Sequence, residues 1–161
     1  MSNERWKPSV TVAAVVARDG RYLLVEEHTP EGLRLNNPAG HLDAGEGLME
    51  ACVRETLEET AYRLQPEALV GVYLSRFQRA GMAEPITYLR FAFTGTVEGP
   101  VAGQKLDSGI VRALWLTPDE IRASQDRHRS PLVLRCMEDH QAGRRFPLDL
   151  IHTDLALWQA R

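Results

Sequence analysis

Three glutamates of this sequence are spaced so that a helix would gather them into a site for a divalent metal ion. Glu55, Glu58 and Glu59 would converge within roughly 100° of arc on the helix surface. Like charges at this spacing destabilise a helix by roughly 0.2–0.5 kcal/mol per pair unless solvent or a cation compensates. Oxygen-only ligands suit hard ions such as Mg²⁺ or Mn²⁺. A solvated acidic face would have the same composition, so the surrounding residues must decide between the two.

The residues before the cluster supply that evidence, because their spacing matches a known motif. Six charged or glycine positions stand at its fixed intervals: Gly40, Glu46, Arg54, Glu55, Glu58 and Glu59. The stretch 40–62 therefore resembles the Nudix box, G-x5-E-x7-R-E-U-x-E-E-x-G-U, where U is a bulky apolar residue. A random chain of this length would match those six positions on the order of once in 10⁵. The resemblance implies a Nudix hydrolase with a divalent metal cofactor.

Two positions depart from the motif. Thr56 stands where a bulky apolar residue is usual, and Ala61 replaces the closing glycine. A left-handed residue at the end of the helix would cost alanine about 1 kcal/mol.

The resemblance also implies roles for individual residues. Glu58 and Glu59 would ligate the metal, and Glu55 would be a ligand or the base that orients water. The Gly40 carbonyl would be a further ligand, and Arg54 would hold the glutamates in place.

Other acidic and polar residues are weaker candidates. Glu46 is either a ligand or only a capping partner, and a later loop could add Asp107 as a ligand, ahead of Glu98 and Asp119. Substrate-binding residues stay open. Asn37 and Lys105 are candidates, and a heterocycle could also be held by several residues that the core could equally use: Asn36, Tyr73, Arg76, Phe77, Tyr88 and Arg90.

The metal explains how an acidic cluster could act on a polyanion. Glutamates alone would repel a diphosphate, whereas divalent cations bridge phosphate oxygens and lower the pKa of bound water. A neighbouring carboxylate with a raised pKa can then accept the proton. The expected reaction is attack of water on phosphorus.

Motifs outside the box narrow the resemblance to a subgroup. Segments 7–16, 37–42, 129–133 and 143–148 look like the NudJ-type bacterial Nudix phosphatases. That subgroup implies release of the terminal phosphate from nucleoside tri- and diphosphates and from hydroxymethylpyrimidine diphosphate, a thiamine precursor, with Mg²⁺ or with Mn²⁺ in its place. Two alternatives remain: a pyrophosphohydrolase that produces nucleoside monophosphates, and a nucleotide-binding module without turnover.

The elements that must position these residues follow from periodicity. The box helix is predicted from about Leu48 to Ala61, opened by an Asp43–Glu46 capping box, with Met49, Val53 and Leu57 on its apolar face. Strands are expected at 10–17, 22–25, 33–36, 67–77, 86–97 and 111–116, a long loop at 98–109, and helices after Thr117 and Ser130. Residues 26–28 are expected to be solvated. This order favours an α+β fold with a mixed β-sheet, and the resemblance implies an α/β/α sandwich.

Composition limits the remaining possibilities. The 161 residues fit one domain, 1–161, with a net charge of −3 that gives no reason to expect a nucleic acid polymer as partner. No apolar run approaches the roughly 20 residues that span a membrane. Cys52 and Cys136 are isolated and predicted to be buried, which favours a reducing, cytoplasmic location. The partner is expected to be a small phosphorylated substrate, and the protein is a monomer or a homodimer.

Overall fold

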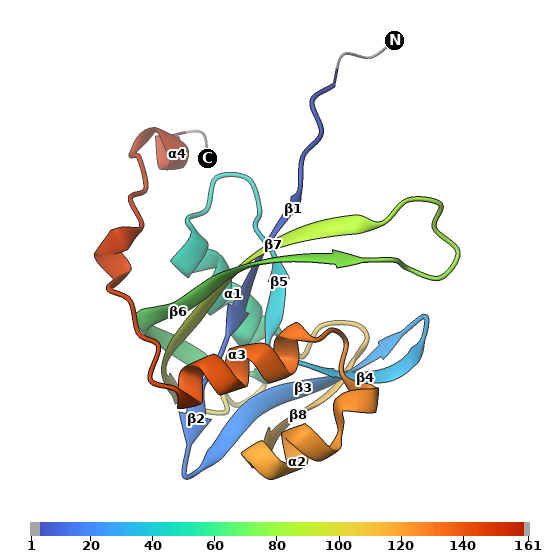
Figure 1. The fold of residues 1–161 in the computed structure, drawn as a ribbon. Helices are drawn as coiled ribbons and strands as arrows, with labels where there is room; N and C mark the ends of the chain where they lie inside the picture. The colour runs from blue at the N-terminus through green and yellow to red at the C-terminus, as the bar shows by residue number, and fades with distance from the viewer. Residues whose placement is uncertain (1–3, 160–161) are drawn as a thin grey trace.

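Two four-stranded sheets and the helices that cover them make up the computed structural model, which describes residues 4–159 (Figure 1). The elements in chain order are β1 Ser9–Ala14, β2 Ala17–Arg18, β3 Arg21–Thr29, β4 Gly32–Asn36, β5 Ala39–His41, α1 Leu48–Thr60, β6 Arg63–Phe77, β7 Ile86–Glu98, β8 Ile110–Leu116, α2 Pro118–Ala123, α3 Leu132–Gln141 and α4 Ala156–Gln159. Single turns of 3₁₀ helix lie at Gln125–Arg127 and Leu148–Leu150.

The first sheet is mixed, as the sequence predicted. Its strand order is β5-β1-β7-β6, with β1 and β7 parallel and the outer pairs antiparallel. In the second sheet β3 pairs with β2 and β4 along one edge and with β8 along the other. Strand β5 is an addition to the prediction: three residues that follow Asn37-Pro38 and carry Gly40 to the edge of β1.

Helices lie on both faces of the first sheet, so the predicted α/β/α layering is confirmed. Along β1, Val12 and Ala14 face a core that includes Ala51 and Cys52 of α1. Ala13, between them, faces a second core, to which α3 contributes Val133, Cys136 and Met137. Alternate residues of a strand point to opposite faces, and both faces of this strand are buried, which explains its nearly continuous apolar sequence.

Helix α1 begins at the predicted Leu48 and ends at Thr60, one residue before the predicted end, but its N-terminal cap differs from the prediction. Gly47 is its N-cap, and the Gly47 backbone N–H donates to Glu50 Oε1 at 3.4 Å. Asp43 and Glu46 instead form the turn before it, where the Asp43 N–H donates to Glu46 Oε1 at 2.8 Å. The predicted Asp43–Glu46 helix cap was therefore wrong, because the chain enters the helix only at Gly47, four residues after Asp43.

The buried stripe of α1 also differs from the prediction. Met49 and Val53 are only partly buried, whereas Cys52, Thr56 and Thr60 are almost fully buried. The hydroxyl of Thr56 donates to the Cys52 carbonyl at 2.7 Å, so this unusual residue satisfies its polar group within the helix. The helix ends at Thr60 and is capped by Ala61, which adopts the left-handed conformation in spite of its side chain, with φ 64°.

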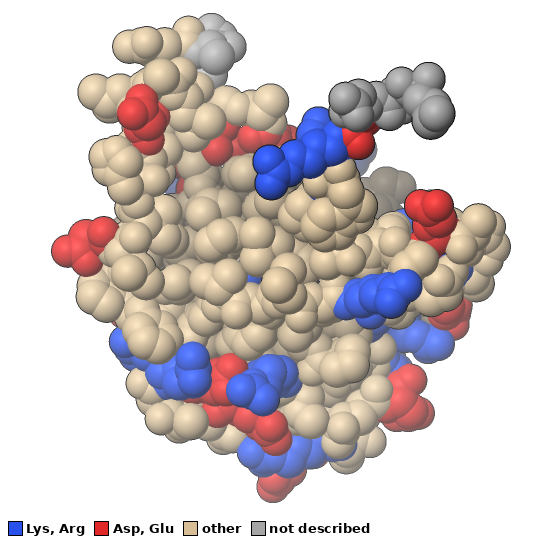
Figure 2. All heavy atoms as spheres, turned by 45° about the horizontal axis from the view of Figure 1, so that its top comes forward, with Lys and Arg blue, Asp and Glu red and all other residues tan. Residues whose placement is uncertain are grey.

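The surface is mixed in charge. On the face in Figure 2, acidic and basic side chains are interspersed around the lower rim, and uncharged residues form the centre. Exposed apolar side chains include Val72 and Leu74 of β6 and Leu155 near the C-terminal end. Within residues 4–159, no helix combines the length and the apolar character that crossing a membrane requires.

Candidate active site

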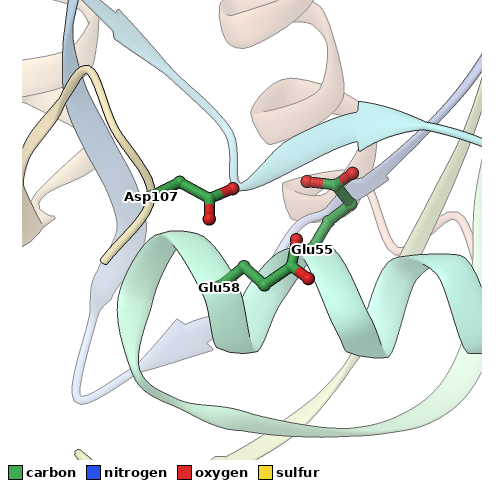
Figure 3. A group of neighbouring side chains, drawn as sticks. All are labelled: Glu55, Glu58 and Asp107. Carbon is green, nitrogen blue, oxygen red and sulfur yellow. The ribbon is translucent and has the colours of Figure 1, made fainter. Parts of the chain in front are cut away.

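Three carboxylates from two distant parts of the chain meet beside α1. Glu55 and Glu58 come from the helix and Asp107 from the loop before β8, and each offers an oxygen within 4.8 Å of the others (Figure 3). Glu55 and Glu58 are partly buried, and Asp107 is exposed. The acidic residue that the sequence expected from a later loop is therefore placed beside the box glutamates.

Backbone hydrogen bonds hold the Asp107 loop against the helix. The Asp107 N–H donates to the Glu58 carbonyl at 2.9 Å, and the Val101 N–H donates to the Ala61 carbonyl at 2.8 Å. These acceptors lie in the last turn of the helix and at its end, where carbonyls lack partners within the helix. The loop satisfies these acceptors and, in doing so, positions the Asp107 carboxylate.

The guanidinium group of Arg54 forms hydrogen bonds with the neighbouring glutamates. Its guanidinium donates to Glu46 at 2.7 and 3.0 Å, to Glu55 at 2.8 Å and to Glu58 at 3.2 Å. The hydrogen bond from Arg54 lowers the pKa of Glu46. Glu46 is thus held by Arg54 and lies outside the three-carboxylate cluster, which favours its structural role over the metal role.

The carboxyl group of Glu55 is more desolvated than that of a glutamate at the protein surface. Desolvation raises its pKa, the charges of Glu58 and Asp107 add to the rise, and Arg54 opposes it. A carboxylate with a raised pKa is a better proton acceptor. Its position in the cluster therefore suits a ligand or a base.

Glu59 stands apart from these three residues. It is 5% exposed, and its Oε1 accepts from the Ala39 N–H at 2.9 Å. Burial raises its pKa to about 8, and the charges of Glu27, Glu55 and Asp107 act in the same direction. The carboxylate ties the Pro38-Ala39-Gly40 turn to α1, a role that the helical spacing alone did not indicate. Its predicted role as a metal ligand stays a prediction.

Gly40 lies against the Glu55 carboxylate. A Cβ at Gly40 would lie 2.0 Å from Glu55 Cδ and 2.1 and 2.2 Å from its oxygens. Such distances are too short for any non-bonded contact, so only glycine lets the turn and the carboxylate lie this close.

The remaining predicted residues have different surroundings. Asn37 is 2% exposed, and its Oδ1 accepts a hydrogen bond from Arg90 at 3.0 Å. This buried side chain therefore holds a neighbouring residue of the site in place. Lys105 is exposed on the loop, and Glu98 is exposed at the end of β7. Asp119 lies in the first turn of α2 and pairs with Arg122 at 3.4 Å, outside the three-carboxylate cluster.

A cavity of about 190 Å³ opens beside Ala39 and Gly40. Its floor is one face of the first sheet, because Thr11, Arg90 and Tyr88 stand on the same side of their strands. The face of β7 that carries Tyr88 and Arg90 therefore lines a cleft. Of the residues suggested for the heterocycle, the lining includes four: Asn36, Phe77, Tyr88 and Arg90.

Residues 26–28 were expected to be solvated, and for the two glutamates this was wrong. Glu26 is 7% exposed and pairs with Arg112 and Arg127. Glu27 lines the cavity and pairs with Arg129 at 3.1 Å. Both glutamates lie within β3, which runs four residues further than predicted. Their arginine partners are more than 80 residues away in the chain, so no local pattern could have indicated the pairs.

Comparison with known proteins identifies the fold and the family. The NUDIX domain model matches residues 6–136. Over 146 residues the chain is 38% identical to "Phosphatase NudJ" of Escherichia coli strain K12. The aligned residues make up 91% of this chain and 92% of that protein. A Nudix hydrolase from Nitrosomonas europaea has 51% identity and a TM-score of 0.83, covering 92% of this chain and 98% of its own.

A more distant structure agrees in fold alone. The MutT Nudix hydrolase from Burkholderia pseudomallei has 21% identity and a TM-score of 0.66, covering 83% of this chain and 98% of its own. The domain match spans most of the chain, including the whole box from Gly40 to Tyr62. The chain therefore belongs to the Nudix family and is a hydrolase of phosphoanhydride bonds, of the NudJ phosphatase type.

Proposed function

We propose that this Nudix hydrolase is a metal-dependent phosphatase that removes the terminal phosphate from nucleoside tri- and diphosphates and from hydroxymethylpyrimidine diphosphate. The observation that carries the proposal is the likeness to the NudJ phosphatase over 91% of the chain. The cluster of Glu55, Glu58 and Asp107 supports it, because it lies beside a cavity large enough to hold part of a small phosphorylated molecule.

The carboxylates fit a divalent cation. Glu55, Glu58 and Asp107 would hold it through oxygen atoms, the ligands that Mg²⁺ and Mn²⁺ prefer, and Glu59 and the Gly40 carbonyl are further predicted ligands. When bound, Mg²⁺, or Mn²⁺ in its place, would neutralise phosphate charge and lower the pKa of a coordinated water.

The protein's own residues would divide the remaining work. Glu55 would accept the proton of the attacking water, because burial gives its carboxyl group a raised pKa. Arg54 would keep Glu55 and Glu58 in fixed positions through its hydrogen bonds. Phe77 and Tyr88 line the cavity and offer aromatic faces to a heterocycle.

Product analysis in ¹⁸O-labelled water tests the proposal. A nucleoside triphosphate and hydroxymethylpyrimidine diphosphate would be incubated with the enzyme and Mg²⁺, and separately with Mn²⁺. We expect inorganic phosphate that carries the label, because water attacks the terminal phosphorus. Release of pyrophosphate together with the nucleoside monophosphate from the triphosphate would reject the phosphatase in favour of a pyrophosphohydrolase. Nucleotide binding without any turnover would indicate a binding module.

Three general properties belong to the same proposal. The buried free thiols of Cys52 and Cys136 support a reducing, cytoplasmic location. The two cores share strands of one sheet, which supports a single domain over 1–161. The partner would be a small phosphorylated substrate, with a monomer or a homodimer as the working unit.

A further inference from the structure

Arg90 is a buried cation that lines the cavity. It stands on β7, opposite Thr11 of β1 and Tyr73 of β6, and is only 6% exposed. Arginine stays protonated in proteins, so its charge cannot be removed by losing a proton. Burying such a charge is strongly unfavourable unless an opposite charge compensates.

The neighbours of Arg90 give hydrogen bonds without a negative charge. Its Nη1 donates to Asn37 Oδ1 at 3.0 Å, and its Nη2 donates to Asn36 Oδ1 at 3.4 Å. Its Nη1 also lies 3.9 Å from Cys136 Sγ, and burial raises the pKa of that thiol, which keeps it neutral. Both asparagines present amide oxygens, where a carboxylate would have supplied a counter-ion.

The ion pairs of residues 4–159 include none with Arg90, which separates it from the other buried charges near the site. Arg129, on the same cavity wall, is paired with Glu27 at 3.1 Å. Arg79 lines the cavity as well and has no ion pair among these residues. The lining thus holds three arginines and one glutamate, an excess of positive charge beside a strongly acidic cluster.

An anion in the cavity would supply the missing charge. After the terminal phosphate leaves, the organic product of the proposed reaction still carries a phosphate. A guanidinium recognises phosphate through charge-assisted hydrogen bonds, which are roughly twice as strong as neutral ones. The cavity begins at Gly40, next to the carboxylate cluster, so the two sites lie side by side.

We propose that Arg90 is a specificity-determining residue that binds the phosphate retained by the organic product, so the cavity selects phosphorylated molecules over their dephosphorylated forms. The inference rests on the proposed function, since it assigns part of the same substrate. It predicts that a nucleoside monophosphate binds and that the free nucleoside binds poorly.

Calorimetric titration of the full-length protein with AMP and with adenosine, in EDTA and without divalent metal, tests the inference. We expect AMP to bind at least about tenfold more tightly than adenosine, with a difference that shrinks as salt rises. In Arg90→Gln the two affinities should come within about threefold of each other. Arg76→Gln is the matched control, because Arg76 is exposed on the neighbouring strand and outside the cavity lining, and it should retain the wild-type preference.

Equal affinities of the wild-type protein for AMP and adenosine would overturn the inference, and this comparison needs no variant. An unchanged preference in Arg90→Gln would overturn it too. If Arg90→Gln does not fold, Arg90→Lys keeps the charge without the planar fork and should show a weakened preference for AMP. An unchanged preference for AMP over adenosine in Arg90→Lys would show that the guanidinium group is not needed to recognise the phosphate, and would overturn the inference.

The binding assay is independent of turnover. Preference for AMP that depends on Arg90, without phosphate release from any substrate, would retain the inference and reject the proposed function. Phosphate release by a protein with equal affinities for AMP and adenosine would do the reverse.

Discussion

Gly40 and the carboxylate of Glu55 lie so close that a Cβ on Gly40 would be 2.0 Å from Glu55 Cδ. The glycine belongs to β5 and the glutamate to α1, so this contact joins the first residue of the box to the helix within it. It gives the first glycine of the motif a steric reason that is independent of backbone conformation. Glu59 makes the second link, through its hydrogen bond to the Ala39 N–H.

Gly40→Ala should therefore damage the site more than the fold. The added methyl group meets the far end of a flexible side chain, so Glu55 can rotate away while the backbone stays in place. We expect phosphate release to fall by roughly 100-fold, because a displacement of about 1 Å at a catalytic group can cost that much. The free energy of unfolding should change by less than about 1 kcal/mol.

Gly47→Ala is the matched control in the same motif. A Cβ there would meet its nearest atom, Glu50 Oε1, at 3.4 Å, an ordinary contact. It should keep most of the activity. Equal activity losses in the two variants would contradict the steric account.

Asp107→Asn tests the loop residue as a metal ligand. The variant keeps the backbone hydrogen bond to Glu58 and loses only the carboxylate charge. We expect the Mg²⁺ concentration for half-maximal activity to rise by about tenfold or more. Asp119→Asn, which pairs only on the surface with Arg122, should leave the Mg²⁺ titration unchanged. A wild-type titration curve for Asp107→Asn would remove this residue from the metal site.

Glu59→Gln separates catalysis from folding. The amide oxygen can still accept from Ala39, and an ionisable group whose pKa is raised by burial is replaced by a neutral one of the same shape, so the fold should be retained or slightly stabilised. We expect Mg²⁺-dependent turnover to fall by roughly 100-fold or more, if Glu59 serves the metal. Glu98→Gln, at an exposed site, is the control. If Glu59→Gln retained wild-type turnover, the role of Glu59 would be purely structural.

Ala61 carries a backbone conformation that glycine adopts at lower cost. Its φ is 64°, so Ala61→Gly should raise the free energy of unfolding by roughly 1 kcal/mol, measured by urea denaturation. Gly143, at the end of α3, offers the opposite test, because its φ is 82° and a Cβ there would meet nothing within 4 Å. Gly143→Ala should lower the free energy of unfolding by a similar amount. A destabilised Ala61→Gly would show that the buried methyl group matters more than the backbone.

His140 should make stability depend on pH. Burial, assisted by the charge of Arg145, lowers its pKa from 6.5 to about 4. The unfolded chain therefore binds a proton that the folded chain excludes between these values, and stability is lost as the pH falls from 6.5 to 4.

The partly buried ring should account for roughly 1 kcal/mol of that loss, after solvent screening is allowed for. Urea unfolding at pH 7 and pH 5 should show a smaller loss for His140→Gln than for the wild-type protein. Equal losses in the two proteins would indicate that other groups control the loss of stability at acidic pH.

Local spacing was sufficient to predict the box helix and part of its chemistry. Helical geometry places residues three apart on one face, so Glu55 and Glu58 were certain to be neighbours once the helix formed. Ala61 stands where the motif has glycine, so the sequence left the helix exit open, and only the structure shows it to be left-handed. The cap of α1 was not predictable either, since Gly47 has no side chain that would mark it.

The sequence by itself thus determined the family, the mixed sheet and the local part of the acidic cluster, all of which depend on periodicity and fixed intervals. Tertiary structure decided what joins the cluster and what lies beside it. Asp107 reaches Glu58 only because its loop hydrogen-bonds to the last turn of α1. Arg90 lacks a carboxylate only because Asn36 and Asn37 are brought to it from another strand and the turn that follows. Contacts between residues about 50 positions apart depend on sheet register and on burial, neither of which the local pattern specifies.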